Sequence, residues 1–325
     1  MADNDVRDVV MIGAGPSALA ASVYTTREDI DTVLYEKGVV GGMAAITDKV
    51  DNYPGFPEGI EGMRLAALLQ AQAERFGAQI EFGEVSQIRD DGTHKTLVID
   101  GQEVKAKTVL IATGSDYKKT GVPGEAEFFG RGVHYCATCD GAFYRDKKLA
   151  VIGGGNSAVQ ETIFLTRFAT HIDLLVRSTI KASDVLQKEL QKYVDAGKVT
   201  VHLATETKEI VATDGKITSV RAETEGGEVS FTVDGVFVFV GLLPNTGFLK
   251  GSAIELDEIG LIKTDHTLQT SMKGVYASGD VRSGATLQIA SAVGEGATAA
   301  LNIREYLDGL NHHVGNDEST PVQAT

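Results

Sequence analysis

Short apolar runs rich in β-branched residues recur along the chain, and most are followed by glycine. They are nearly continuous rather than strictly alternating, which is typical of strands covered on both faces. Helix-like stretches lie between several of them, and strands that alternate with helices predict an α/β fold with parallel sheets. The expected strands are 9–12, 32–35, 108–111, 149–152, 172–176, 236–240 and 275–277, and the expected helices include 19–27, 64–76 and 157–168.

The combination of strand, glycine cluster and helix occurs twice, starting near residues 9 and 149. This separation is too long for a solenoid repeat and fits two related nucleotide-binding domains. Because glycine-rich segments flank the second copy, we expect it to be inserted into a discontinuous first domain. The expected first domain is 1–116 plus 247–325, and the inserted domain is 117–246. The polar tail, 311–325, has no periodicity and is predicted to be disordered.

Composition narrows the class of protein. The 325 residues include 45 acidic and 30 basic side chains, giving a net charge of −15. A nucleic-acid surface needs clustered Lys and Arg, so this balance argues against one. No apolar run is long enough to span a bilayer, and the start, MADNDVRD, has no signal-peptide pattern. These features predict a soluble cytoplasmic protein that binds neither nucleic acid nor membrane.

The first glycine motif, Gly13-Ala14-Gly15-Pro16-Ser17-Ala18, directly follows the first expected strand. It matches the G-x-G-x-x-(G/A) pattern of dinucleotide-binding loops. Gly13 permits the tight turn, Gly15 lets the backbone approach a pyrophosphate, and Ala18 allows the helix to pack closely on the strand. Glu36 comes at the end of the next strand, where a carboxylate binds ribose hydroxyls. The first domain is therefore predicted to bind a dinucleotide.

The second motif, Gly153-Gly154-Gly155-Asn156-Ser157-Ala158, also follows an apolar strand. The position equivalent to Glu36 is Val176, followed by Arg177, so no carboxylate stands there for a ribose 2′-hydroxyl. Arg177 and Lys181 can instead bind a 2′-phosphate, which favours NADP(H). Two such loops in one chain indicate two dinucleotides, one donating and one accepting hydride.

Only two cysteines occur, Cys136 and Cys139, in a CxxC window. A zinc site needs about four ligands, and even with His134 only three are at hand, so no metal site is predicted. A disulfide that closes so small a loop adds little stability, which favours a redox-active dithiol. Asp140 directly follows and can exchange a proton with a thiolate.

The segment 136–141, CATCDG, lies between the two glycine motifs and resembles the redox centre of low-molecular-weight thioredoxin reductases. Supporting motifs occur in that family's order at 41–42, 51–56, 112–114, 274–280 and 294–297. The resemblance implies two Rossmann-like domains of the three-layer ββα type, the second inserted in the first. It also implies FAD on the first domain, NADPH on the inserted one, a homodimer, and thioredoxin or a thioredoxin-like protein as partner.

The resemblance further implies roles for individual residues. Cys139 would face the flavin, Cys136 would attack the partner's disulfide, and Asp140 would relay a proton. The implied FAD-binding residues are Gly13, Gly15, Pro16, Ser17, Glu36, Lys37, Gly41, Gly42, Met43, Asn52, Val85, Ala112, Gly114, Gly279, Asp280, Gln288 and Ile289. The implied NADPH-binding residues are Gly153, Gly155, Asn156, Ser157, Arg177 and Lys181.

The sequence departs from the family pattern at several of these places. Met43 replaces a glutamine and Leu287 an arginine near the flavin, and the cationic phosphate cluster is reduced to Arg177 and Lys181. Lysine cannot reproduce the bidentate geometry of arginine. The same flavin–dithiol chemistry with NADH or a non-nicotinamide donor is therefore an alternative. A third hypothesis is a non-enzymatic redox sensor that binds dinucleotides; ferredoxin–NADP reductases of this fold normally lack the CxxC.

Overall fold

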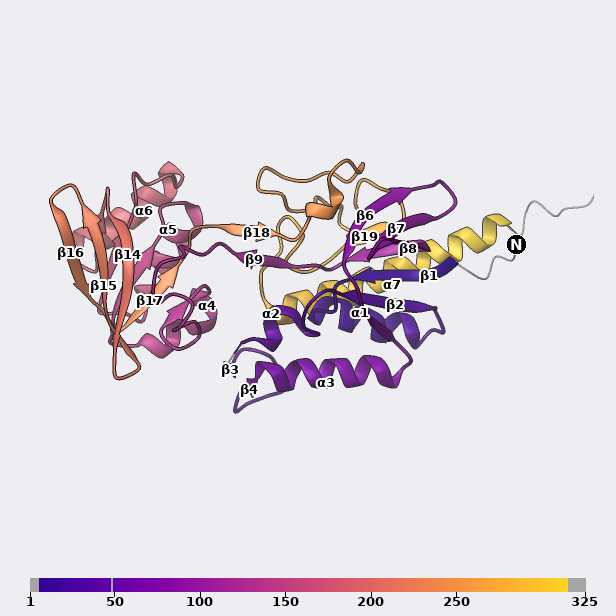
Figure 1. Cartoon of the computed structure of the whole chain (residues 1–325), viewed down its shortest axis with the longest axis horizontal. Helices are drawn as coiled ribbons and strands as arrows, with labels where there is room; N and C mark the ends of the chain where they lie inside the picture. Colours follow the sequence, from indigo (N-terminus) through magenta and orange to yellow (C-terminus); the bar gives the residue numbers. More distant parts are fainter. Residues whose placement is uncertain (1–5, 48, 315–325) are drawn as a thin grey trace, which may run out of the picture. The chain divides into compact units, whose positions relative to one another are not determined.

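The computed structural model describes residues 6–47 and 49–314 and divides the chain into two compact units. Unit 1 comprises residues 1–116 and 244–325, and unit 2 comprises residues 117–243. The return to unit 1 lies at Pro244, whereas the glycine-rich segment predicts it at Gly247. The chain passes between the units in β9 (Ser115–Tyr117) and β18 (Leu242–Pro244), which pair with each other (Figure 1).

Unit 1 is built on a sheet whose central strands are parallel. β1 runs between β2 and β8, with Val10 opposite Val33 on one side and Val109 on the other. Beyond this parallel part, β8 also pairs antiparallel with β7, which pairs with β6. The strands are β5 (Gln79–Phe82), β2 (Thr32–Glu36), β1 (Val6–Ile12), β8 (Gln102–Ile111), β19 (Val275–Ala277), β7 (Lys95–Ile99) and β6 (Val85–Asp90).

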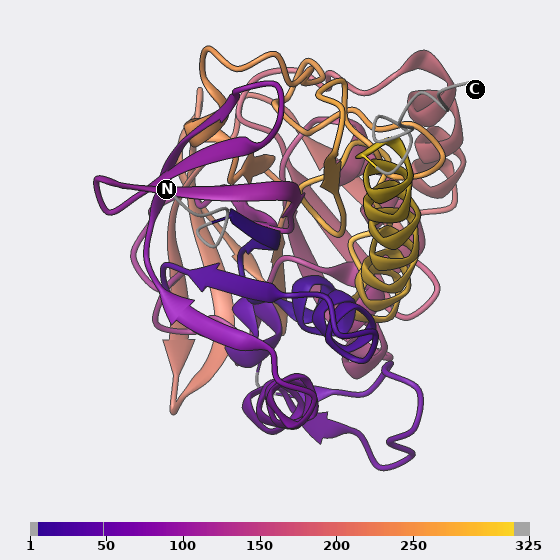
Figure 2. The same ribbon diagram turned by 90° about the vertical axis from the view of Figure 1, so that its right-hand side faces the viewer.

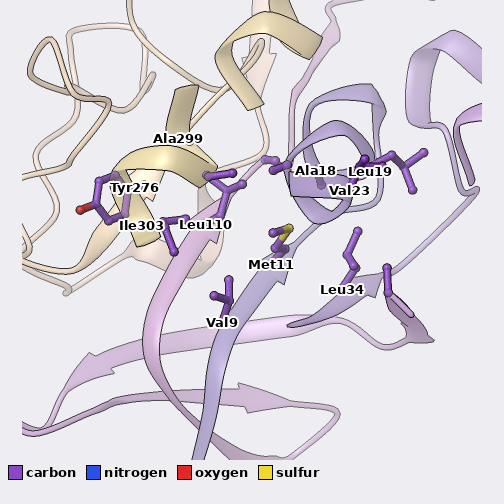
Figure 3. Packing of buried hydrophobic residues seen from close by; sticks show 14 of the residues in the cluster. Val9, Met11, Ala18, Leu19, Val23, Leu34, Leu110, Tyr276, Ala299 and Ile303 are labelled. Atoms are coloured by element: carbon purple, nitrogen blue, oxygen red, sulfur yellow. The ribbon is translucent and has the colours of Figure 1, made fainter. Parts of the chain in front are cut away.

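Both faces of this sheet are covered, which explains the continuous apolar runs. Successive side chains of a strand point to opposite faces, so Val9 and Met11 pack against helices while Val10 and Ile12 pack on the side of β6 and β7. All four are at most 4% exposed. Figure 3 shows the helical side, where strand residues meet α1 (Pro16–Thr26) and α7 (Ile289–Val314).

The remaining elements of unit 1 are α3 (Gly62–Arg75), which packs against α1, and the short α2 (Gly42–Ala45), β3 (Lys49–Val50), β4 (Ile60–Glu61) and η2 (Gly247–Leu249). Figure 2 shows α1 and α7 side by side. The prediction of disorder from residue 311 is wrong for 311–314, which continue α7. Ile303 and Leu307 anchor the helix, and adding residues to a formed helix costs little. Residues 315–325 lie outside the described part.

Unit 2 repeats the three-layer plan around a five-stranded parallel sheet. Leu149 and Val151 pack toward the helices, and Ala150 and Ile152 pack toward an antiparallel three-stranded sheet on the other face. The predicted α/β fold of ββα type is thereby confirmed. The parallel strands are β10 (Val133–His134), β17 (Gly235–Val238), β11 (Lys148–Ile152), β12 (His171–Leu175) and β13 (Val199–His202); the antiparallel strands are β14 (Glu206–Thr213), β15 (Lys216–Thr224) and β16 (Gly227–Thr232); the helices are α4 (Ala137–Asp140), η1 (Gly141–Tyr144), α5 (Asn156–Leu165) and α6 (Asp184–Asp195).

Candidate functional site

Glycine is suited to the two positions of the first loop for different structural reasons. Gly13 has a φ of +96°, and a Cβ there would lie 2.6 Å from the carbonyl oxygen of Ala112. A Cβ on Gly15, the N-cap of α1, would meet no protein atom within 4 Å. Among the described residues no side chain caps α1, and its first turn has no acidic residue, so its first N–H groups are available to an anion. The loop has the free space and the donors that a pyrophosphate needs.

Glu36 is fixed at the end of β2 by one backbone N–H of this loop and one from the segment after β2. The N–H of Ala14 donates to its Oε2 at 2.7 Å, and the N–H of Gly38 donates to its Oε1 at 2.7 Å. Each carboxylate oxygen keeps a lone pair that can accept from a hydroxyl. Glu36 lines a cavity of about 560 Å³ within unit 1. Four predicted site residues line this cavity: Gly13, Glu36, Lys37 and Val85.

Further predicted residues gather around the start of α1. The N–H of Gly41 donates to the carbonyl of Ala14 at 2.8 Å, and a Cβ on Gly42 would lie 3.6 Å from the Cα of Gly15. Gly279 has a φ of +72°, and a Cβ there would lie 3.2 Å from the Cβ of Ser17. Residues far apart in the sequence therefore surround one helix terminus closely.

The other predicted residues of unit 1 are joined to this region by contacts between distant segments. Asn52 donates from Nδ2 to the Oε1 of Gln288 at 3.0 Å, directly before α7 begins at Ile289. The carbonyl of Gly114 accepts from the N–H of Asn245. Of the two residues that depart from the family pattern at the expected flavin site, Met43 lies half-buried in α2, and Leu287 has a φ of +57°.

Asp280 follows β19 and carries a largely buried carboxyl group. Burial, reinforced by the nearby carboxylate of Glu295, raises its pKa to about 6. Glu295 is itself paired with Arg282 at 2.5 Å. Within the part of the chain that the structure describes, the Asp280 side chain accepts no hydrogen bond from a protein group. Such a carboxylate can accept hydrogen bonds from the hydroxyl groups of a bound ligand. The residues of unit 1 thus fit FAD.

Asp280→Asn is expected to stabilise the flavin-free protein at neutral pH. Because the folded-state pKa lies above the ordinary value of 3.8, the folded state binds the extra proton, and stability is lost as the pH rises from about 4 through about 6. Removing the charge should recover about 2 kcal/mol at pH above 7 and much less near pH 4. Urea unfolding of both flavin-free proteins at the two pH values measures this. An equal gain in the free energy of unfolding at both pH values would show that the raised pKa of Asp280 is not its cause.

The second loop, in unit 2, has the same geometry as the first. Gly153 has a φ of +146°, and a Cβ there would collide with the carbonyl oxygen of Phe239. A Cβ on Gly155, the N-cap of α5, would meet no protein atom within 4 Å. The Oδ1 of Asn156 accepts from the N–H of Ser183 at 2.9 Å and so ties the loop to the segment before α6.

All six predicted NADPH-binding residues line one cavity of about 760 Å³ within unit 2. Sequence reasoning missed three charged residues of its lining: Lys118, Lys119 and Glu206. The position in unit 2 that is equivalent to Glu36 holds no carboxylate, but the carboxylate of Glu206 lines the same cavity. A hydrogen bond from Lys208 lowers its pKa, and Arg177 acts in the same direction. Its place in the cavity follows from the position of β13 in the sheet, because carboxyl ends of parallel strands line the ligand crevice, and no local sequence pattern indicates it.

Cys136 and Cys139 form a disulfide at the start of α4, with Cα atoms 5.3 Å apart. Cys136 is half-buried and caps the helix, and Cys139 is exposed. The backbone N–H of Cys139 donates to the Sγ of Cys136 at 3.1 Å. A hydrogen bond to sulfur favours the thiolate, so the geometry suits Cys136 as a nucleophile once the pair is reduced.

Asp140 is the last residue of α4, and its carboxylate contacts a buried histidine. Its Oδ2 lies 3.2 Å from the Nδ1 of His134, and the Nε2 of that ring lies 2.7 Å from the hydroxyl of Tyr144. His134 is 6% exposed. In the sequence, His134 stands out only as a possible metal ligand. Over residues 6–47 and 49–314, no cluster of side chains suited to a metal ion and no helix able to cross a membrane is found.

Two pyrophosphate-type loops on two ββα units, with a disulfide on one of them, define the class of dinucleotide-dependent disulfide oxidoreductases. The model of the family "Pyridine nucleotide-disulphide oxidoreductase" matches residues 7–296, and the chain belongs to that family, within its thioredoxin reductase branch of low molecular weight. Membership makes it an FAD-dependent oxidoreductase that uses a nicotinamide dinucleotide.

Several known proteins are similar to the chain over nearly its full length. Thioredoxin reductase of Bacillus subtilis is 40% identical over 95% of this chain and 98% of its own, and that of Listeria innocua is 39% identical over 95% and 96%. The crystal structure of thioredoxin reductase from Streptococcus pyogenes is 38% identical, covers 94% of this chain and 100% of its own, and superposes with a TM-score of 0.88.

Proposed function

We propose that the protein reduces thioredoxin or a thioredoxin-like protein, with electrons that pass from NADPH through FAD to Cys136 and Cys139. FAD is assigned to unit 1 and NADPH to unit 2. The observation that carries the proposal is the disulfide at the start of α4 with Asp140 beside it, in the unit that also holds the second dinucleotide loop. A structural disulfide would need neither a second dinucleotide nor an adjacent acid.

When bound, FAD would supply the two electrons that open the disulfide. Two protons are needed as well: one arrives with the hydride of NADPH and one comes from solvent. Because Cys139 would face the flavin, the sulfur that departs is that of Cys136, and Asp140 would give it a proton. In the other half of the cycle, Cys136 returns this proton to Asp140, and its thiolate attacks one sulfur of the partner disulfide and releases the first partner thiolate. The Cys139 thiolate then attacks Cys136. This step restores the disulfide and releases the second partner thiolate, and the two partner thiolates take up the two protons.

Anaerobic titration of the FAD-loaded protein tests this proposal. We expect NADPH to bleach the flavin absorbance and oxidised thioredoxin, added afterwards, to restore it with the appearance of free thiols on thioredoxin. NADH, added in a parallel titration, tests the alternative donor. Bleaching by NADPH without any response to thioredoxin would contradict the assigned partner. A flavin that neither nucleotide bleaches would favour a different electron donor.

Arg177→Ala is expected to raise the KM for NADPH about tenfold and to leave the KM for NADH nearly unchanged. A charge-assisted hydrogen bond to the 2′-phosphate, which NADH lacks, supplies this difference on a partly exposed surface. Steady-state rates measured with NADPH and with NADH give the two KM values for each protein. The matched variant Glu206→Gln removes a negative charge from the same cavity and should shift the preference toward NADPH. Equal changes for both nucleotides in Arg177→Ala would show that this side chain does not contact the 2′-phosphate.

Family membership also supports a homodimer and a cytoplasmic location. Light scattering of the FAD-loaded protein at several concentrations tests the first, and fractionation of the source cells tests the second.

A further inference from the structure

His134 is held rigidly next to the proton-transfer residue of the redox centre. It ends β10, opposite Phe237 of β17, and the two ring centroids lie 5.2 Å apart. The ring of Tyr144 packs edge-on against both, with its centroid 5.3 Å from that of His134. A Cβ on Gly235 would collide with the Tyr144 ring, so glycine at that position makes room for it. Packing therefore fixes where both nitrogens of His134 point.

The contacts with Asp140 and Tyr144 together indicate which nitrogen of His134 carries a proton, because an ionised carboxylate can only accept a hydrogen bond, whereas a tyrosine hydroxyl can also donate one. Burial raises the pKa of Tyr144 far above its usual value, and the carboxylates of Asp140 and Asp234 add to this shift. The hydroxyl therefore keeps its proton at physiological pH and can donate it to the Nε2 of a neutral His134 at 2.7 Å. The ring proton is then on Nδ1, which faces the Oδ2 of Asp140 at 3.2 Å. A protonated ring would also present an N–H there.

We propose that His134 is a positioning residue for Asp140: its Nδ1–H holds one carboxylate oxygen and leaves the other free to exchange a proton with the cysteine pair. The inference rests on the proposed function, which makes Asp140 the proton relay. His134 does not touch the sulfur atoms in this scheme. It acts through Asp140, and Tyr144 acts through His134 by fixing the tautomer. The contact of 3.2 Å is within hydrogen-bond distance but is not aligned as a hydrogen bond in this structure, as is common for catalytic groups before the partner binds.

Titratable groups around the ring come from three elements. Asp140 ends α4, Tyr144 ends η1, and Asp234, just before β17, acts on the hydroxyl of Tyr144. The N–H of Lys148 donates to the Oδ2 of Asp234 at 2.9 Å, and the Nζ of Lys147 lies 3.9 Å from its Oδ1. Asp234 is thus held by other partners, which leaves Asp140 as the acidic group in contact with the imidazole among the described residues.

Two amide substitutions separate the positioning role from a purely structural one. The side-chain nitrogen of asparagine lies where Nδ1 of histidine lies, whereas that of glutamine lies nearer to Nε2. His134→Asn therefore keeps a donor for Asp140, and His134→Gln loses it, although both replace the ring by a buried amide. Tyr144→Phe removes the hydroxyl alone and keeps the packing.

The FAD-loaded variants are compared in steady-state reduction of thioredoxin and in anaerobic bleaching of the flavin by NADPH, which does not require the cysteine pair. We expect kcat to fall about tenfold in His134→Gln and a few-fold in Tyr144→Phe, with the KM for thioredoxin and the bleaching rate unchanged, and His134→Asn to retain a third or more of kcat. Asp140→Asn, whose kcat is expected to fall about 100-fold, shows how large the loss is when the proton-transfer group itself is removed.

Equal losses in His134→Asn and His134→Gln, or full activity in His134→Gln, would overturn the inference. Failure of the proposed function looks different, because the wild-type protein itself would then not reduce thioredoxin. In that case the same ratios between variants are measured with a small aromatic disulfide as the acceptor. The same order of rates there supports the positioning role of His134, and equal rates refute it.

Discussion

Replacing Cys139 with serine is expected to lower thioredoxin reduction by at least about 10³-fold while FAD stays bound. The serine hydroxyl cannot form a disulfide with Cys136, so the pair can neither store two electrons nor release the partner from a mixed disulfide. The substitution removes one sulfur atom from an exposed position at the start of α4, and the flavin site is proposed for the other unit. NADPH-dependent thiol production on thioredoxin measures the loss, and the visible absorbance measures the flavin.

Thr138→Ser provides the matched control for this prediction. Thr138 is exposed and lies between the two cysteines, so its substitution tests whether any change in this turn impairs the enzyme. It should retain nearly full activity. Substantial thioredoxin reduction by Cys139→Ser would mean that electrons reach the partner by a route without the Cys136–Cys139 disulfide, and the assigned mechanism would be wrong.

Substitution by alanine should affect different properties at the two glycines of the first loop: protein stability at Gly13 and FAD binding at Gly15. Gly13→Ala is expected to destabilise the protein by about 2–4 kcal/mol, because a side chain is strained at a φ of +96° and its Cβ would lie 2.6 Å from the carbonyl oxygen of Ala112. Gly15→Ala should leave the free energy of unfolding within about 1 kcal/mol of wild type, since its φ of −74° suits alanine and no protein atom is near. It should nevertheless weaken FAD binding at least about 100-fold, because the methyl group occupies the space of the pyrophosphate.

Urea unfolding of the flavin-free proteins and titration with FAD separate these two outcomes. Gly309→Ala serves as a control, because Gly309 lies within α7 and a Cβ there also meets no atom within 4 Å. It should bind FAD normally and gain about 1 kcal/mol, as expected for glycine in a helix interior. Normal FAD affinity in Gly15→Ala would show that the pyrophosphate lies elsewhere.

Much of the fold and site could be predicted because the signals are local. The near-continuous apolar runs indicated strands covered on both faces, and Val9 to Ile12 and Leu149 to Ile152 do divide their side chains between two packed layers. The glycine loops were recognisable because a sharp turn between a strand and a helix restricts residue type within a few positions.

Features that depend on residues distant in the sequence were not predictable in the same way. Glu206 lies in the second cavity because β13 is placed beside β12 in the sheet, and the spacing along the chain does not report that neighbour. The hydrogen bond between Asn52 and Gln288 joins segments 236 residues apart. The helical state of residues 311–314 depends on the packing of α7 against α1, whereas the polar composition of that segment suggested disorder.

The sequence by itself determined the chemistry of this protein: two dinucleotide loops, one cysteine pair and an adjacent acid, each encoded within a short segment whose backbone conformation allows few residue types. Only the tertiary structure decided which groups act on that chemistry. It brought His134 from one strand, Asp140 from a helix and Tyr144 from a 3₁₀ turn into contact, and it placed Glu206 among the cations of the second cavity. The physical reason is that protonation and charge preference depend on distances through space, which the packing of strands and helices sets.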